Sequence, residues 1–216
     1  MLAVGVDDAG RGSIIGPLVL AGVLHPEDKM EELKELGVKD SKRLTPTRRA
    51  KLAELIKSSV KAYHVVEIPP SEIDEKVGSG VKFRRLNFLE AKAAAEIIAR
   101  LRPRVAYLDS CDVDAGRFAW QVSSLLPFKV KIVSEHGADA KYPIVAAASI
   151  LAKVHRDQVI ARLREAYGDF GSGYPSDPKT RSFLESWFKA HGSYPAFVRR
   201  TWKTLRRIPG RAGLNV

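Results

Sequence analysis

The stretch that decides the fold is Leu2-Ala3-Val4-Gly5-Val6-Asp7-Asp8-Ala9-Gly10-Arg11-Gly12, which passes from apolar residues through two acids into a glycine turn. Residues 2–6 predict a strand, and the β-branched run 14–24 predicts a second one. The glycine turn between them makes the two strands antiparallel neighbours. This strand ends in two acidic residues, Asp7 and Asp8, although the chain as a whole is basic. The sheet and the candidate site therefore begin at the same place.

The composition predicts a basic globular protein with one sizeable core. Of its 216 residues 45% are hydrophobic, and 36 Lys and Arg against 25 Asp and Glu give a net charge of +11. That excess favours a polyanionic partner, most commonly nucleic acid, although solvated lysines give the same count. The single cysteine, Cys111, excludes an internal disulfide. Without a signal peptide or an apolar run of ~20 residues, we expect a cytoplasmic protein with no membrane partner.

The rest of the chain predicts an α/β fold with a mixed sheet. Further strands are expected at 60–68, 105–108 and 129–133, and helices at 29–36, 46–58, 84–101, 115–125 and 140–167, with a short helix opening after 69–71. After Tyr167 the composition changes to glycines and prolines, followed by a basic, aromatic tail. We therefore expect a main domain over residues 1–167 and a small helical extension over 168–216.

Four acids stand at the predicted ends of strands or at the start of a helix. Asp7 and Asp8 end the first strand, Asp109 ends another, and Asp139 opens the helix that follows a third. Parallel strands can bring such groups together at one sheet edge, where they cannot all stay ionised without a counter-charge. Oxygen ligands select Mg²⁺ or Mn²⁺ over zinc. Each acid alone is equally a cap or turn former, so the metal site is at this point a hypothesis.

The Gly10-Arg11-Gly12 turn has two interpretations. Together with Gly16 it is close to a dinucleotide-binding fingerprint, but the third glycine comes one place late and a strand pattern follows where a helix is needed. The better interpretation is a turn whose exposed N–H groups, with the Arg11 side chain, face a phosphate or a sugar.

Five segments, in the same order along the chain, resemble ribonuclease HII, and the resemblance covers nearly the whole sequence. The segments are Val4–Gly12 with Gly16-Pro17-Leu18, Asp40-Ser41-Lys42-Arg43-Leu44, Tyr107-Leu108-Asp109-Ser110, the stretch from Ala138-Asp139-Ala140-Lys141-Tyr142-Pro143 to Arg156-Asp157, and Gly171-Ser172-Gly173-Tyr174-Pro175-Ser176-Asp177. The last of them looks like the archaeal form of the family's tyrosine loop.

The resemblance implies a ribonuclease H-like fold, with a five-stranded mixed sheet flanked by helices and a small C-terminal helical subdomain. Residues 1–167 would be the catalytic domain and residues 168–216 the substrate-binding extension. It also implies that Asp7, Asp8, Asp109 and Asp139 are catalytic and hold two Mg²⁺ or Mn²⁺ ions. Asp7 is the best candidate to bridge both ions, because it stands at the end of the central first strand. Asp8 is a departure, because the family normally has Glu there. Its carboxylate is set back by roughly 1.5 Å, the length of one methylene.

The implied activity is hydrolysis of the RNA strand of RNA/DNA hybrids, and cleavage 5′ of ribonucleotides embedded in duplex DNA. Two-metal-ion catalysis would leave 3′-hydroxyl and 5′-phosphate ends, in the removal of misincorporated ribonucleotides and RNA primers. The resemblance assigns recognition of the RNA-to-DNA junction to Gly10, Arg11, Gly12 and Tyr174, while Lys42 is a plausible phosphate contact. We expect a monomer, and residues 211–214 give no convincing sliding-clamp motif.

Three other functions remain open from the sequence. A metal-free ribonuclease would use two of the five histidines as acid and base and leave a cyclic phosphate. Another nuclease of the same fold, such as a junction resolvase, would not need a ribonucleotide. A binding module could have lost an essential acid at Asp8.

The basic tail has two interpretations: it either lines a nucleic-acid path or forms one solvated helix face. Its basic residues around Trp202 are Arg199, Arg200, Lys203, Arg206 and Arg207.

Overall fold

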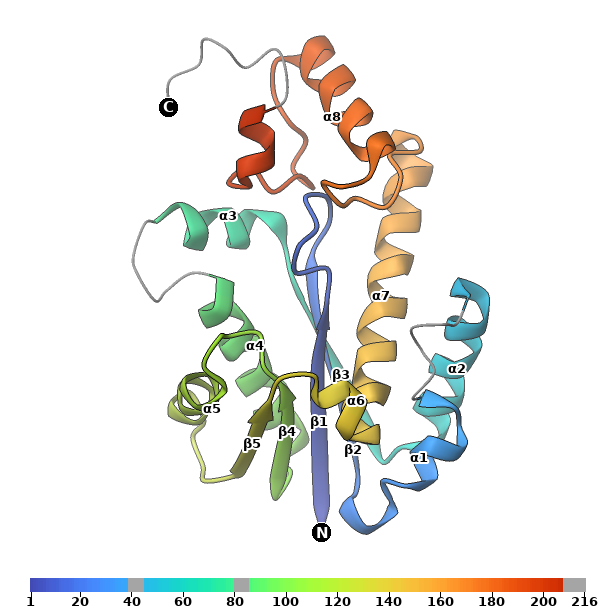
Figure 1. Ribbon diagram of the computed structural model, residues 1–216, viewed down its shortest axis with the longest axis vertical. Helices are drawn as coiled ribbons and strands as arrows, with labels where there is room; N and C mark the ends of the chain where they lie inside the picture. Colours follow the sequence, from blue (N-terminus) through green and yellow to red (C-terminus); the bar gives the residue numbers. More distant parts are fainter. Residues whose placement is uncertain (39–44, 80–85, 208–216) are drawn as a thin grey trace.

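The molecule is built around a five-stranded mixed sheet (Figure 1). The structure is a computed structural model that describes residues 1–38, 45–79 and 86–207. The strand order is β3-β2-β1-β4-β5, where β1 is antiparallel to β2 and parallel to β4. The bounds are β1 Leu2–Ala9, β2 Leu18–Pro26, β3 Ala62–Ile68, β4 Val105–Asp109 and β5 Lys131–Glu135. The predicted mixed sheet is confirmed, and β1 is its central strand.

Helices cover both faces of this sheet, with α1, α2 and α7 on one side and α4 and α5 on the other (Figure 1). The helices are α1 Glu32–Glu35, α2 Pro46–Ser59, α3 Pro70–Gly78, α4 Leu86–Leu101, α5 Ala115–Ser124, α6 Ala138–Lys141, α7 Pro143–Tyr167 and α8 Pro178–His191, with 3-10 turns at Glu27–Lys29 and Lys203–Arg207. Thr45 caps α2 by accepting a hydrogen bond from the Arg48 N–H, as its sequence predicts. None of the helices in these described segments is long and apolar enough to cross a membrane.

The side chains of β1 alternate between the two faces of the sheet. Ala3 and Ala9 belong to the core beneath α7, whereas Val4 and Val6 belong to the core beneath α4 and α5. A strand has a side-chain period of two residues. The adjacent acids that follow Val6 therefore face opposite sides of the sheet.

The one long helix expected at 140–167 is wrong in its first residues, because the chain forms two helices there. Pro143 has no N–H to continue the earlier turn, and it holds Tyr142 in an extended conformation with φ −110° and ψ 116°. Asp139 thus lies in the short α6 and does not open the long helix. The second strand also begins later than expected, at Leu18.

The residues just before β2 belong to a third core, formed with the C-terminal segment. Ile14 and Ile15 pack there with Phe170, Leu184 and Val198. In Figure 1 the loop after β1 reaches the orange and red C-terminal segment at the top of the molecule. The Gly16 N–H donates to the Phe197 carbonyl at 2.9 Å. The proposed boundary at 167/168 remains a prediction, and the C-terminal segment holds the loop that follows the central strand.

Close contact between β1 and α7 gives a first test. A Cβ on Gly5 would lie 2.4 Å from the Ile144 backbone carbonyl carbon, so α7 would have to move away from the sheet. We expect Gly5→Ala to lower the free energy of unfolding by about 2–3 kcal/mol, measured by urea denaturation. The control is Gly78→Ala, whose Cβ would meet only Thr201 Cγ2 at 3.6 Å. A Gly5→Ala protein as stable as this control would contradict the packing described.

Candidate active site

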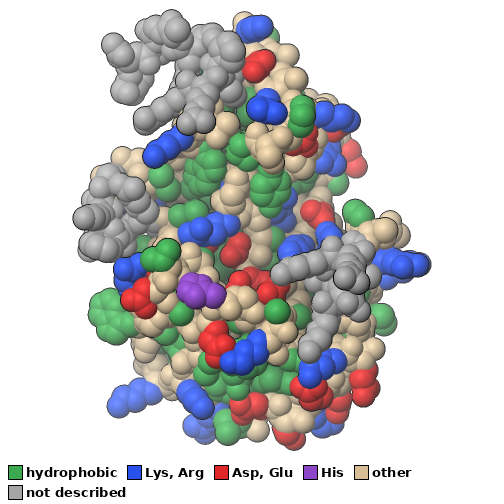
Figure 2. Space-filling view, viewed as in Figure 1, with side chains coloured by type: hydrophobic (Ala, Val, Ile, Leu, Met, Phe, Trp, Pro, Cys, Tyr) green, Lys and Arg blue, Asp and Glu red, His purple; other side chains and the backbone are tan. Residues whose placement is uncertain are grey.

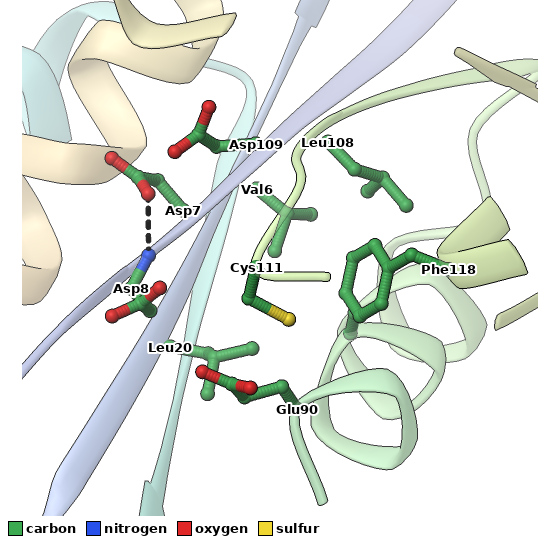
Figure 3. Close-up of a pocket in the computed structure, with 10 residues that line it drawn as sticks. Val6, Asp7, Asp8, Leu20, Glu90, Leu108, Asp109, Cys111 and Phe118 are labelled. Atoms are coloured by element: carbon green, nitrogen blue, oxygen red, sulfur yellow. Dashed lines mark hydrogen bonds between the residues drawn. The ribbon is translucent and has the colours of Figure 1, made fainter. Parts of the chain in front are cut away.

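A small pocket lies where β1 and β4 end beside α4 (Figure 3). Four of its lining residues are acids, which is unusual in a setting that is otherwise apolar. The lining consists of Asp7, Asp8, Glu90 and Asp109 with Val6, Leu20, Ala94, Leu108, Cys111 and Phe118. The pocket brings together three of the four acids singled out in the sequence, and adds a fourth carboxylate from α4.

Strand register explains why Asp7 and Asp109 are close. Val6 is paired with Leu108 in the parallel β1–β4 ladder, so the next residue of each strand is an aspartate. Residues that continue a parallel register share a face, and Figure 3 shows the two carboxylates on the same side of the strand. The Asp8 N–H donates to Asp7 Oδ1 at 2.7 Å. The Ala138 N–H donates to Asp109 Oδ1, also at 2.7 Å, and so ties α6 to the site.

Burial and mutual repulsion make the charged forms of these acids unfavourable. The pKa of Asp7 is raised to about 7, first by burial and then by the negative charge of Asp8, while a hydrogen bond from Ser149 lowers it. The pKa of Asp8 is likewise raised to about 7, first by burial and then by the negative charge of Glu90. The charge of Asp109 raises both pKa values. A cation among the three would let all of them ionise.

Positive groups stand beside the acids without neutralising them. Arg11 and Lys153 both lower the pKa of Asp8, and Lys153 Nζ donates to Ser149 Oγ at 2.8 Å on α7. In the space-filling view, acidic side chains occupy the middle of the face shown, with Lys and Arg side chains close by (Figure 2). An acidic centre with basic surroundings suits a site where metal and polyanion meet.

Glu90 is a site residue that the sequence reasoning missed. Its side chain is 1% exposed, and Oε1 accepts a hydrogen bond from Arg11 Nε at 2.8 Å. Arg11 Nη2 also donates to Asn87 Oδ1, so α4 holds this guanidinium by two residues one turn apart. A signal was available, because Glu90 stands among the buried positions Leu89, Ala93, Ala94 and Ile97 of an otherwise apolar helix face.

The remaining candidates from the sequence are not among the residues that line the pocket. Asp139 does not line the pocket, although it directly follows Ala138, which is bonded to Asp109. Over the described ranges, no three His, Cys, Asp or Glu side chains form a ready-made metal-ligand group. Lys42 falls outside the described residues. Asp112 pairs with Arg117, and Asp114 accepts from the Arg117 N–H as the N-cap of α5, so both acids have structural partners.

The glycine turn and Tyr174 lie around two buried arginines. Arg156 is 5% exposed, donates to the carbonyls of Ile15 and Ser172, and lies 4.8 Å from the centre of the Tyr174 ring. Arg199 is fully buried and donates to carbonyls of the turn. Both interpretations offered for Arg199 from the sequence are therefore wrong, because it neither lines a path nor lies on a solvated face.

Comparison with known proteins agrees with this geometry over nearly the whole chain. The family model described as Ribonuclease HII matches residues 4–205. Ribonuclease HII of Pyrococcus abyssi is 50% identical over 96% of this chain and 91% of its own length. The crystal structure of ribonuclease H2 from Pyrococcus horikoshii superposes with a TM-score of 0.90 at 46% identity, covering 100% of both chains. The ribonuclease HII in a complex with PCNA from Archaeoglobus fulgidus gives 0.86 at 43% identity, covering 96% of each chain. The chain belongs to the ribonuclease HII family.

Proposed function

We propose that this protein cuts the RNA strand of RNA/DNA hybrids and cuts 5′ of ribonucleotides embedded in duplex DNA. As a member of the ribonuclease HII family it is a ribonuclease H, an endoribonuclease that acts on RNA/DNA hybrids. The finer proposal adds cleavage at single ribonucleotides, 3′-hydroxyl and 5′-phosphate ends, and the removal of misincorporated ribonucleotides and RNA primers.

The observation that carries the proposal is the group of buried acids at the ends of β1 and β4. Asp7 and Asp8 have pKa values of about 7 and share the field of Asp109. None of the five histidines lines this pocket. A metal-free mechanism with a histidine acid–base pair therefore has no support at this site, whereas a cation-dependent mechanism does.

The donor set fits two Mg²⁺ or Mn²⁺ ions, because every candidate ligand is a carboxylate oxygen. Asp7, Asp8 and Asp109 would hold the ions, and Asp139 is the fourth proposed ligand. When bound, the ions would supply an activated water and neutralise charge on the scissile phosphate. Ser149 and the Ala138 N–H orient Asp7 and Asp109 by hydrogen bonds, which fixes where these ligands lie before metal enters.

Asp8 in place of the usual Glu does not remove the acid from the site. Its carboxyl lies close enough to Glu90 for that charge to raise its pKa, so the two acids crowd one side of β1. The shorter side chain reaches less far, and a water can bridge to Mg²⁺, which commonly keeps several. We therefore propose an active enzyme with an altered preference between the two metals.

The substrate contacts follow from the loops beside the acids. The Arg11 side chain of the glycine turn reaches the pocket through its ion pair with Glu90, and the Tyr174 ring packs against Arg156. We propose that this turn and Tyr174 recognise the 2′-hydroxyl and the neighbouring deoxyribose. Lys42 remains a proposed phosphate contact.

The cellular setting is also a proposal. The solved Archaeoglobus fulgidus relative is in a complex with PCNA, so a sliding clamp is a candidate partner here. Residues 211–214, where the sequence shows no clear clamp motif, lie outside the described part of the chain. A monomer in the cytoplasm remains the expectation.

Metal-linked stability tests the acidic site without any cleavage assay. Folding raises the pKa of Asp7 from 3.8 to about 7, so the folded protein binds more protons than the unfolded chain between about pH 4 and pH 7. Stability from this group is therefore present at low pH and lost as pH rises to about 7. At pH 8 without metal we expect Asp7→Asn to be more stable than the unmutated protein, by on the order of 2 kcal/mol.

Urea denaturation at pH 5 and pH 8, with and without millimolar Mg²⁺, checks this. Mg²⁺ should stabilise the unmutated protein at pH 8 and stabilise Asp7→Asn far less. The matched control is Asp28→Asn, at an acid with a 76% exposed side chain, which should keep the full response to Mg²⁺. An unmutated protein that gains nothing from Mg²⁺ or Mn²⁺ would contradict the metal site.

Product mapping tests the reaction itself. On a DNA duplex with one ribonucleotide, we expect a single cut 5′ of that nucleotide, with a 3′-hydroxyl and a 5′-phosphate. Asp7→Asn should lower kcat by more than about 100-fold, beyond the effect typical of residues that only support a ligand. Asp8→Glu should stay active and change the ratio of Mn²⁺- to Mg²⁺-supported rates.

An identical duplex without the ribonucleotide serves as the substrate control and should remain intact. Cleavage of that duplex would favour another nuclease of this fold. A cyclic phosphate product would point to the histidine mechanism, and absence of cleavage in both metals would point to a binding module.

A further inference from the structure

Arg199 is the largest fully buried side chain of the described molecule, and neither the metal site nor the stacking on Tyr174 uses it. It lies between α8 and the 3-10 turn Lys203–Arg207, in the C-terminal segment. Burying a guanidinium away from water is costly unless its donors are satisfied. An apolar side chain would anchor the segment at lower cost. The hydrogen bonds that Arg199 makes therefore indicate what else this residue does.

All three donor atoms of Arg199 are aimed at backbone carbonyls of the turn after β1. Nη2 donates to the Gly10 carbonyl at 2.8 Å, Nη1 to the Arg11 carbonyl at 2.9 Å and Nε to the Gly16 carbonyl at 3.1 Å. In addition, the Arg199 N–H donates to the Ile14 carbonyl at 2.9 Å. One residue, distant in sequence, thus sets the orientation of several peptide groups in the turn.

Because the peptide bond is planar, these contacts also determine where the N–H groups of the turn point. In a trans peptide the C=O group and the next N–H group point in opposite directions. Because Arg199 draws the carbonyls of Gly10 and Arg11 inward, the N–H groups of Arg11 and Gly12 must point away from it. Gly12 is exposed, and the Arg11 side chain is bound to Glu90 at the pocket. Two successive donors therefore face the side on which substrate would arrive.

We propose that Arg199 is a positioning residue for ribonucleotide recognition, which orients the Arg11 and Gly12 N–H groups toward the sugar of the substrate. This inference rests on the proposed function, in which that turn recognises the 2′-hydroxyl. The Arg11 carbonyl accepts from Arg199, whereas the Gly10 carbonyl also accepts from Ser13 Oγ at 2.8 Å. The Gly12 N–H is therefore the donor that depends most on Arg199.

Geometry and charge can be separated by substitution. Lysine keeps the positive charge but lacks the planar fork that reaches three carbonyls at once. If Arg199 acted through charge on a phosphate, Arg199→Lys would restore binding. If it acts by orienting peptides, Arg199→Lys should be nearly as defective as Arg199→Gln. The matched control is Arg200→Gln, which removes an exposed guanidinium that donates to the Tyr194 carbonyl.

The first measurement compares two duplexes that differ by one 2′-hydroxyl. The KM of the duplex with one ribonucleotide is set against the Ki of the all-DNA duplex as a competitive inhibitor. Both Arg199 variants should raise that KM about tenfold, as for a lost hydrogen bond, and leave Ki within about twofold. Arg200→Gln should change KM and Ki by the same factor, because a lost phosphate contact affects both duplexes.

An unchanged ratio of KM to Ki in both Arg199 variants, or rescue by Arg199→Lys, would overturn the inference. The second measurement needs no activity: the amide NMR resonances of Arg11 and Gly12 in the free protein should move in Arg199→Lys and stay in place in Arg200→Gln. Unmoved resonances would also overturn it. A different outcome would contradict the proposed function instead. In that case the resonances move in Arg199→Lys, but the unmutated protein already binds both duplexes equally well.

Discussion

The structure depends on the burial of two adjacent acids on its central strand. Asp7 and Asp8 continue β1 beyond its apolar residues, and the alternation of the strand sends one toward α7 and the other toward α4. Burial and the neighbouring negative charges raise the pKa of each acid to about 7. The fold thus holds charge that destabilises it when the acids ionise, a common sign of a functional site. A divalent cation would remove that cost, which links stability to the proposed chemistry.

The C-terminal segment completes the site by holding the turn that directly follows the acids of β1. It packs against Ile14 and Ile15, accepts the Gly16 N–H through Phe197, and inserts Arg199 beneath the glycine turn. The acids and the turn are only a few residues apart in sequence, yet they are held by different layers of the molecule. Metal binding would depend on the sheet and α7, and sugar recognition on the packing of the C-terminal segment. Substitutions in that segment would therefore alter sugar recognition without touching the acids.

Much of this arrangement could be predicted from the sequence because it depends on local rules. The strand–turn–strand at 2–24, the Thr45 cap and the acids at the ends of β1 and β4 follow from pattern and turn chemistry. The break before Pro143 follows from the same rules, and the expected helix at 140–167 overlooked it. The apolar face of its helix could have indicated that Glu90 is buried, but not that it pairs with Arg11. The burial of Arg199 could not be predicted in this way, because a charged residue in a tail is most often solvated and the contacts of Arg199 come from elements distant in sequence.

The central claim is that the carboxylates at the ends of β1 and β4 hold divalent cations. Anomalous scattering from a crystal of this protein soaked in Mn²⁺ tests it most directly, because the metal is located without reference to activity. The account predicts Mn²⁺ bound by Asp7 and Asp109, with Asp8 and Asp139 as further ligands, directly or through water. Full Mn²⁺ occupancy elsewhere, with these four carboxylates unligated, would contradict it.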